Sequence, residues 1–188
     1  KNHFEGNYVA GNIIVAVAGN IRHREAQKLA ERYFSGLRRG VALEPGTPPE
    51  VHSGRLIRRK SHLEQTHVCL GTTAPPIASE DRYCAHLLSN ILGGGMSSRL
   101  FQNIRERRGL VYSIYSMLNL YQDAGSLVVY AGSAHEKAAE VVDLVLKEFG
   151  SLRKQLVSAE ELKRAKEYAK GSVMLSLESS SSRMTHLA

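Results

Sequence analysis

Histidine is the residue type in this sequence best suited to hold a catalytic metal, and the chain contains eight. A hydrolytic zinc site needs two histidines one helical turn apart, so that both imidazoles reach one ion, and a glutamate beside them as the base. The nearest approach is His62-Leu63-Glu64-Gln65-Thr66-His67, on a segment that we predict to enter a strand. A strand would place the two imidazoles on opposite faces, so we interpret them as exposed polar side chains. His135-Glu136 begins a predicted helix without a second histidine, and we therefore predict no metal ligands in this chain.

Nucleophilic catalysis finds equally little support. The sequence has no Gly-x-Ser-x-Gly turn, and Cys69 and Cys84 occur singly and far apart, which fits neither a disulfide framework nor a paired-cysteine metal site. Each cysteine lies within an apolar pattern, so we predict buried free thiols. Unpaired cysteines are typical of a reducing compartment, which favours the cytoplasm. The first residues, Lys1-Asn2-His3-Phe4, do not resemble a native start, so they say nothing about a signal peptide.

A glycine run lies at Leu92-Gly93-Gly94-Gly95-Met96-Ser97-Ser98. Backbone N–H groups at a helix start could cradle a phosphate there. The run lacks the Lys-Ser/Thr of a P-loop and follows a predicted helix rather than a strand, so a junction between two helices is the commoner explanation. Gly93, Gly94 and Gly95 are candidate loop residues under either interpretation.

The densest group of functional side chains is Arg105-Glu106-Arg107-Arg108-Gly109-Leu110-Val111-Tyr112. A basic helix end is followed by a glycine and by a tyrosine at the start of a predicted strand, and Gly109 permits a sharp chain reversal between Arg105 and Tyr112. By residue type alone, this is a solvated helix terminus with a core tyrosine.

The elements that position these residues follow from hydrophobic periodicity. Tyr8 to Ala18 predicts a largely buried strand, and the segment after it predicts an amphipathic helix ending near Gly36. Pro45, Pro48 and Pro49, with several glycines, indicate a linker over residues 41–54. We therefore expect one part over residues 1–40 and a second over residues 55–188.

The second part combines alternating and helical patterns. The sequence predicts strands at 55–58 and 65–73, helices at 80–92 and 98–108, a hairpin of 113–121 with 126–132, and helices at 134–153 and from 158 onward. Ser133–Glu136 and Ser158–Glu161 predict capping boxes, and the last helical pattern continues toward Ala188 without a stop. This order predicts an α+β fold with helices packed on a mainly antiparallel sheet.

The formal net charge is +7, with a pI near 9.5. Such a balance suits nucleic acid, an acidic peptide, or an acidic surface elsewhere in the same molecule. Basic residues cluster at Arg38-Arg39, Arg55 to Lys60 and Arg105 to Arg108, and no aromatic residues interleave the first two clusters. Base stacking is therefore not indicated, and we rank nucleic acid last. The longest apolar run, Ile13 to Ala18, is too short for a membrane span, so no membrane partner is expected.

Taken together, these residues resemble one protein family. Leu92 to Phe101, Arg105-Glu106, Arg108-Gly109-Leu110 and Tyr112 to Ser116 resemble the pitrilysin/insulinase-type zinc metallopeptidases, and most closely the bacterial and mitochondrial processing-peptidase branch. The resemblance also covers Asp81-Arg82-Tyr83, Tyr130-Ala131-Gly132 and Glu161 to Gly171. It extends over nearly the whole chain.

The resemblance implies a fold and a role. Family members enclose a peptide substrate between two related halves, and the first half carries a zinc motif, His-x-x-Glu-His, that is absent here. Residues 1–40 would be the closing strand and helix of the catalytic domain, and residues 55–188 most of the metal-free second domain. In some branches this domain supplies an arginine and, seven positions later, a tyrosine that both reach the substrate. Arg105 and Tyr112 match this spacing. The loop Gly93–Gly95 resembles a family loop near the chamber mouth.

Two functions follow, and both stay open at this point. In the first, the chain is the non-catalytic half of the substrate chamber of a zinc endopeptidase that processes peptides or presequences, inactive alone and with zinc in the parent protein. In the second, it belongs to a non-catalytic partner subunit that binds peptides or a catalytic sibling. Self-association into a homo-oligomer is a further expectation.

Overall fold

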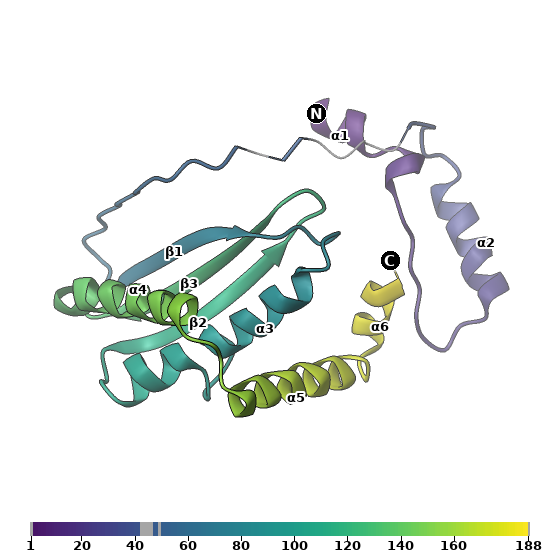
Figure 1. The fold of residues 1–188 in the computed structure, drawn as a ribbon. Coiled ribbons are helices and arrows are strands. Elements are labelled where there is room, and N and C mark those ends of the chain that lie inside the picture. The colour runs from purple at the N-terminus through teal and green to yellow at the C-terminus, as the bar shows by residue number, and fades with distance from the viewer. Residues whose placement is uncertain (1, 42–46, 49, 188) are drawn as a thin grey trace. The chain divides into compact units, whose positions relative to one another are not determined.

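The fold is taken from a computed structural model that describes residues 2–41, 47–48 and 50–187. Two compact units make up the chain: Lys1–Pro45 with Lys170–Ala188, and Gly46–Ala169. Figure 1 shows the helices and strands of both units. Residues 42–46 and 49 of the predicted linker lie outside the described residues. The linker residues that the structure does describe form no helix or strand.

A three-stranded antiparallel sheet organises the second unit. Its strands are β1 (Thr66–Ala74), β2 (Val111–Leu120) and β3 (Gly125–Ser133), in the order β1-β3-β2 (Figure 1). Leu120 pairs with Gly125 at the turn, so β2 and β3 form a hairpin. The predicted hairpin and the α+β class are both confirmed.

Helices cover one face of this sheet. They are α3 (Arg82–Gly93), the π-helix η2 (Phe101–Glu106) and α4 (Ala138–Lys154). The 3-10 turn η3 (His135–Lys137) precedes α4, and α5 (Ala159–Ser176) follows it. Alternate strand residues join them in one buried apolar cluster: Leu92, Leu100, Ile104, Val111, Ile114, Leu127, Val129, Ala131, Val141 and Val145. The strand residues between these point to the opposite side, which we call the open face.

Both cysteines contradict the prediction of buried thiols, because both are exposed and free. Cys69 alternates with the partly buried Val68 and Leu70, so its side chain lies on the open face of the sheet. Cys84 lies on the outer side of α3. An apolar neighbourhood in the sequence did not mean burial, because only one face of each element is covered.

The segment predicted as an α-helix over 98–108 forms a π-helix instead. The N–H of Arg107 donates to the carbonyl of Gln102, five residues earlier, at 3.1 Å. Leu100 and Ile104 are fully buried in this arrangement. An α-helix would also place these two on one side, so apolar spacing could not distinguish the two helix types.

Two predicted strands are absent. Over Tyr8–Ala18 the chain forms the 3-10 turn η1 (Ala10–Asn12) and then irregular backbone, with Ile14 73% exposed. Arg55–Arg58 is likewise exposed and irregular. No other described segment pairs with either stretch, and a strand requires a partner for its backbone groups. The first unit instead contains the helices α1 (Asn2–Asn7), α2 (His23–Phe34) and α6 (Ser180–Leu187).

The last predicted helix is interrupted. α5 ends at Ser176 and α6 begins at Ser180, where the Ser179 hydroxyl accepts from the N–H of Ser182 at 3.4 Å. Serine favours such local bonds over a continuous helix. The capping box at Ser158 is half formed, since its hydroxyl accepts from the N–H of Glu161 at 3.2 Å. The capping box predicted at Ser133 does not form, because the Ser133 hydroxyl donates to the Ala134 carbonyl instead.

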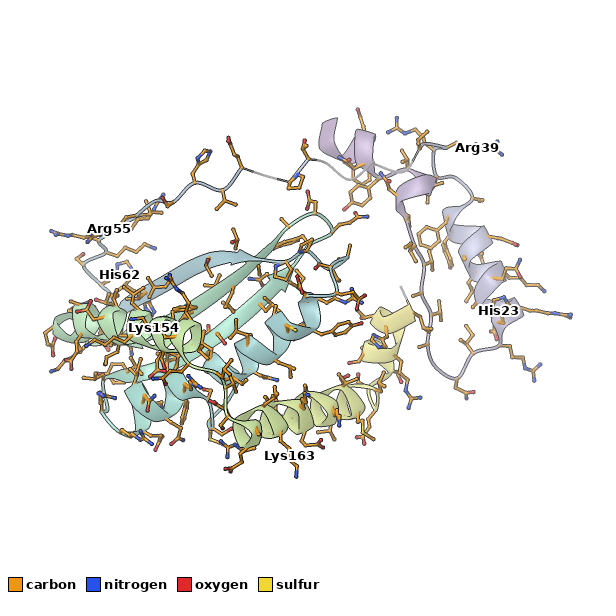
Figure 2. The ribbon with its side chains drawn as sticks, viewed as in Figure 1. His23, Arg39, Arg55, His62, Lys154 and Lys163 are labelled. Atoms are coloured by element: carbon orange, nitrogen blue, oxygen red, sulfur yellow. The ribbon has the colours of Figure 1, made fainter. Side chains whose placement is uncertain are left out.

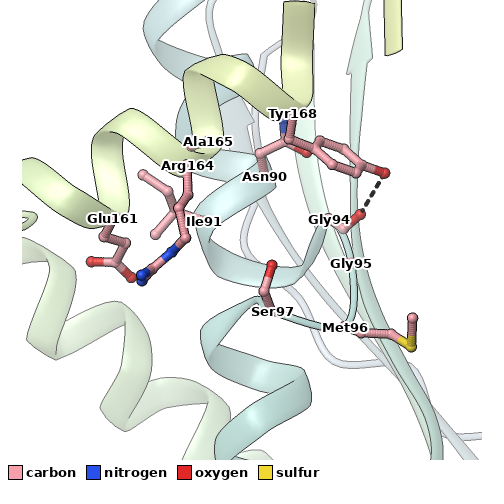
Figure 3. A pocket seen from close by; sticks show the side chains of 10 residues that line it. All are labelled: Asn90, Ile91, Gly94, Gly95, Met96, Ser97, Glu161, Arg164, Ala165 and Tyr168. Atoms are coloured by element: carbon pink, nitrogen blue, oxygen red, sulfur yellow. Dashed lines mark hydrogen bonds between the residues drawn. The ribbon is translucent and has the colours of Figure 1, made fainter. Parts of the chain in front are cut away.

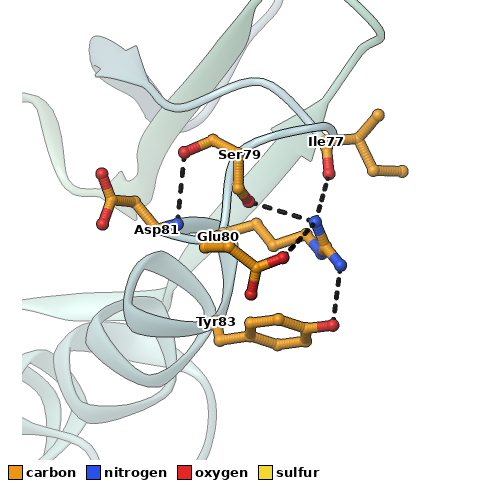
Figure 4. A network of polar contacts seen from close by, with 6 residues as sticks. Ile77, Ser79, Glu80, Asp81 and Tyr83 are labelled. Atoms are coloured by element: carbon orange, nitrogen blue, oxygen red, sulfur yellow. Dashed lines mark hydrogen bonds and ion pairs between the residues drawn. The ribbon is translucent and has the colours of Figure 1, made fainter.

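Arg82 fixes the loop that joins β1 to α3 (Figure 4). Its guanidinium donates to the carbonyls of Ile77 at 2.9 Å and Ser79 at 3.2 Å, and to the Tyr83 hydroxyl at 2.7 Å. It also lies 4.4 Å from the centroid of the Tyr83 ring. The Asp81-Arg82-Tyr83 segment therefore has a local structural task.

Candidate functional site

Arg105 projects from the last turn of η2. Leu100 and Ile104 anchor this helix in the core, which leaves Arg105 on the exposed side. Its guanidinium lies 4.9 Å from the centroid of the Phe101 ring. This cation–π contact positions the side chain while leaving its five N–H donors open to other partners.

Gly109 reverses the chain between Arg105 and Tyr112. Its φ is +61°, in the left-handed region, and its N–H donates to the Arg105 carbonyl at 2.9 Å. A side chain would be strained in this conformation. The sharp reversal expected from the sequence is therefore confirmed, and it connects the helix end directly to β2.

Tyr112 is the extra residue of a β-bulge. Val111 pairs with Ser133 and Ser113 with Gly132, so two residues of β2 lie opposite one residue of β3. Val111 is buried, whereas Tyr112 is 61% exposed. The bulge corrects the prediction of a core tyrosine, because it turns Tyr112 out of the packed face.

The neighbouring arginines are engaged, in contrast to Arg105 and Tyr112. Arg107 donates to the Asn103 side chain at 3.0 Å, and Arg108 donates to the Asn103 carbonyl. Within the described residues, the Arg105 guanidinium and the Tyr112 hydroxyl form no hydrogen bond or ion pair. No contact joins the two side chains to each other. They share exposed positions on either side of the turn at Gly109.

Two positions of the glycine run have a structural reason, and at Gly94 an added Cβ would lie 2.6 Å from Asn90 Cα. A Cβ at Gly93 would lie 2.5 Å from the backbone nitrogen of Ser116, so glycine permits α3 to approach β2 closely. The same approach joins the hydroxyls of Ser89 and Ser116 at 3.0 Å. Gly95 has no atom within 4 Å of a built Cβ and no positive φ. Packing therefore accounts for Gly93 and leaves Gly95 without a structural requirement.

A pocket of about 340 Å³ lies between the glycine loop and α5 (Figure 3). Ile91, Met96 and Ala165 supply apolar wall, and the Tyr168 hydroxyl donates to the Gly94 carbonyl at 3.4 Å. The acidic Glu161 also lines it. Arg164 lines the pocket as well but is bound to Glu160, so the polar lining is mixed in charge and gives the phosphate interpretation no specific support.

A partly buried ion pair fixes α5 to the segment after the glycine loop. Arg99 binds Glu161 through two hydrogen bonds, both 2.7 Å, and each side chain is only about one fifth exposed. The hydrogen bonds from Arg99 lower the pKa of Glu161, and the same bonds raise the pKa of Arg99. Each partner thus stabilises the charged form of the other.

The described histidines lie far from one another or lack further ligand side chains beside them. Among the described residues, no group of three or more His, Cys, Asp or Glu side chains is placed to hold an ion. His62 and His67 are exposed, as the sequence predicted. No described helix has the length and apolar character that crossing a membrane requires.

Sequence reasoning missed a cluster on the open face. His67 Nδ1 lies 2.7 Å from the Tyr130 hydroxyl, and the Tyr130 ring stacks on Tyr115 at 4.9 Å. The strand register creates this arrangement, because Tyr115 lies directly opposite Tyr130 and His67 directly opposite Gly132. Alternation predicted each strand but not which residues would be neighbours across strands.

Comparison with protein families gives a match over most of the chain. Residues 1–168 match the family model described as the peptidase M16 inactive domain. An uncharacterized zinc protease of Bacillus subtilis, YmxG, is 36% identical over 187 residues, covering 98% of this chain and 45% of the relative. An uncharacterized zinc protease of Mycobacterium bovis is 40% identical over 184 residues, covering 96% and 42%. The chain thus spans less than half the length of these relatives.

Solved structures agree on the fold. A peptidase M16 inactive domain from Pseudomonas fluorescens superposes with a TM-score of 0.79 at 28% identity, covering 88% of this chain and 40% of that one. A protease from Helicobacter pylori gives a TM-score of 0.71 at 22% identity, covering 88% and 41%. At that identity the second likeness concerns the fold alone.

Proposed function

Because this chain belongs to the peptidase M16 family as an inactive domain, we propose that it forms the non-catalytic side of a substrate chamber in a zinc-dependent endopeptidase. Arg105 and Tyr112 would contact the substrate peptide. The observation that carries this proposal is that both polar groups are exposed and form no hydrogen bond or ion pair within the described chain, on either side of one fixed turn.

Zinc is expected in the parent protein, since the relatives are named zinc proteases. The described residues of this chain do not fit that role, because no group of ligands converges on one point. We therefore assign the metal ligands to the rest of the parent protein and derive no step of the reaction through the ion.

The chemistry assigned to Arg105 and Tyr112 is electrostatic. Attack on a peptide bond develops negative charge on the carbonyl oxygen, and donors placed near that oxygen lower the barrier. A guanidinium and a phenol both donate hydrogen bonds without prior deprotonation. The contact of Arg105 with Phe101 supports this role because it holds the guanidinium in place before substrate arrives, and the bulge turns Tyr112 outward.

Kinetics of the parent protein test the assignment. Arg105→Ala and Tyr112→Phe should each lower the specificity constant for a peptide substrate by roughly 10²–10³-fold, the usual cost of losing one such donor. Arg107→Ala is the matched control, because it removes an exposed arginine from the same helix end. The Arg107 side chain donates to Asn103 and has no proposed contact with substrate. Circular dichroism should show unchanged folding in all three variants.

Two results would contradict the proposal. Cleavage near wild-type by both variants would return Arg105 and Tyr112 to a structural role. A parent protein that binds peptides without cleaving them would instead support the second function, a non-catalytic partner subunit beside a catalytic sibling.

A further inference from the structure

A groove of about 940 Å³ lies where the irregular segment before β1 meets the start of that strand. Arg58, Arg59 and Lys60 line it together with His67 and His135, and no carboxylate is among its lining residues. Figure 2 shows Arg55 and His62 on the same segment. The groove is therefore strongly cationic.

The three cations are not neutralised by the described part of the chain. Arg58, Arg59 and Lys60 are exposed and form no ion pair with a described residue. Three like charges lining one groove repel each other, and an anionic ligand would relieve that repulsion.

His135 holds the groove in shape. Its Nε2 lies 3.2 Å from the Leu63 carbonyl and its Nδ1 lies 2.6 Å from the Thr66 hydroxyl. Because a carbonyl only accepts, Nε2 carries the proton that it donates to Leu63. The imidazole thus fastens the basic segment to the first residue of β1 and to η3.

His67 connects the groove to the open face of the sheet. It lines the groove and contacts the Tyr130 hydroxyl at 2.7 Å. Gly132, opposite His67 in the sheet, is already covered, because a Cβ there would lie 3.1 Å from Gln65 Oε1 and 3.2 Å from Ser113 Oγ.

We propose that this groove binds an acidic peptide segment, with carboxylates at Arg58, Arg59 and Lys60. The proposal rests on the proposed function in taking a peptide as the ligand. Nucleic acid is the less suitable ligand, because the groove contains no tyrosine or phenylalanine on which a base could stack.

Peptide binding to the parent protein tests this inference by fluorescence anisotropy. The probes are two labelled peptides of equal length, one with several glutamates and one with glutamines in their place. A chelator is present so that metal-dependent hydrolysis does not consume them. The variant is Arg58→Gln, Arg59→Gln and Lys60→Gln combined, and the control is Arg153→Gln, Lys163→Gln and Lys166→Gln, which removes equal charge from exposed helix positions.

The groove variant should bind the glutamate peptide about tenfold more weakly than wild type, since each exposed charge pair contributes modestly. Its affinity for the glutamine peptide should not change. The wild-type preference for glutamate should disappear at about 1 M salt, where screening is nearly complete. Because binding is measured without cleavage, an inactive parent would refute the proposed function while leaving this result valid.

Three outcomes would overturn the inference. An equal loss in the control variant would show that net charge, and not the groove, attracts the peptide. Equal affinity of wild type for both peptides would show that carboxylates are not recognised. Tighter binding of duplex DNA than of the glutamate peptide at the same salt would identify the surface as a nucleic-acid site.

Discussion

Gly93→Ala should loosen the contact between α3 and β2. The added Cβ would lie 2.5 Å from the Ser116 nitrogen and 3.0 Å from its Cβ, about 1 Å inside normal contact distance. Because the obstacle includes backbone, α3 must move outward, and overpacking of this kind costs about 1–3 kcal/mol. The Ser116 hydroxyl would also lose its 2.7 Å bond to the Ser89 carbonyl, a further contribution of about 1 kcal/mol.

Hydrogen exchange of the parent protein, followed by mass spectrometry, measures this loss. A cost of about 2–4 kcal/mol should speed exchange of the protected amides of α3 and β2 roughly 30- to 1000-fold. Gly95→Ala is the control, because its Cβ meets no atom within 4 Å and its exchange should match wild type. Equal exchange in the two variants would refute the packing explanation of Gly93.

Three further predictions concern charge, thiols and the core. Glu161→Gln should lower the free energy of unfolding by about 1–3 kcal/mol near neutral pH. The pKa of Glu161 is lowered in the folded state, so its contribution to stability is present above the ordinary carboxyl pKa and is lost as pH falls through the folded pKa. The melting temperatures of wild type and variant should therefore converge in acid. Convergence in alkali instead would contradict the assignment. Cys69 and Cys84 should react with iodoacetamide in the native protein, as peptide mapping would show, whereas protection until denaturation would mean that they are covered. Ile104→Ala should cost about 2–5 kcal/mol in urea unfolding, because the side chain is fully buried, and a loss below 1 kcal/mol would place it outside the core.

Local patterns predicted the second unit better than the first. The hairpin of β2 and β3 was accessible because its strands alternate and pair with each other over a short turn. Tyr8–Ala18 has an equally apolar sequence, yet strand formation depends on a partner, and no described segment supplies one. The apolar content of a segment alone could not show whether a partner strand is present.

The candidate site was predicted in part for the same reason. The left-handed turn at Gly109 was expected from residue type, since glycine tolerates that conformation. The bulge at Tyr112 was not expected, because it depends on how β2 registers against β3. The groove at Arg58–Lys60 was also missed, since its walls come from segments that are far apart in the sequence.

One-sided helix coverage gives the sheet two different evolutionary constraints. Positions such as Leu127 and Val129 must keep their volume, because they fill a close-packed interior. Positions such as His67, Tyr115 and Met117 are exposed, so a change of side-chain volume there disturbs the packed interior little. Substitutions can therefore accumulate on the open face while the fold stays intact, and if the proposed peptide binding is correct, they would alter ligand preference there without a loss of stability.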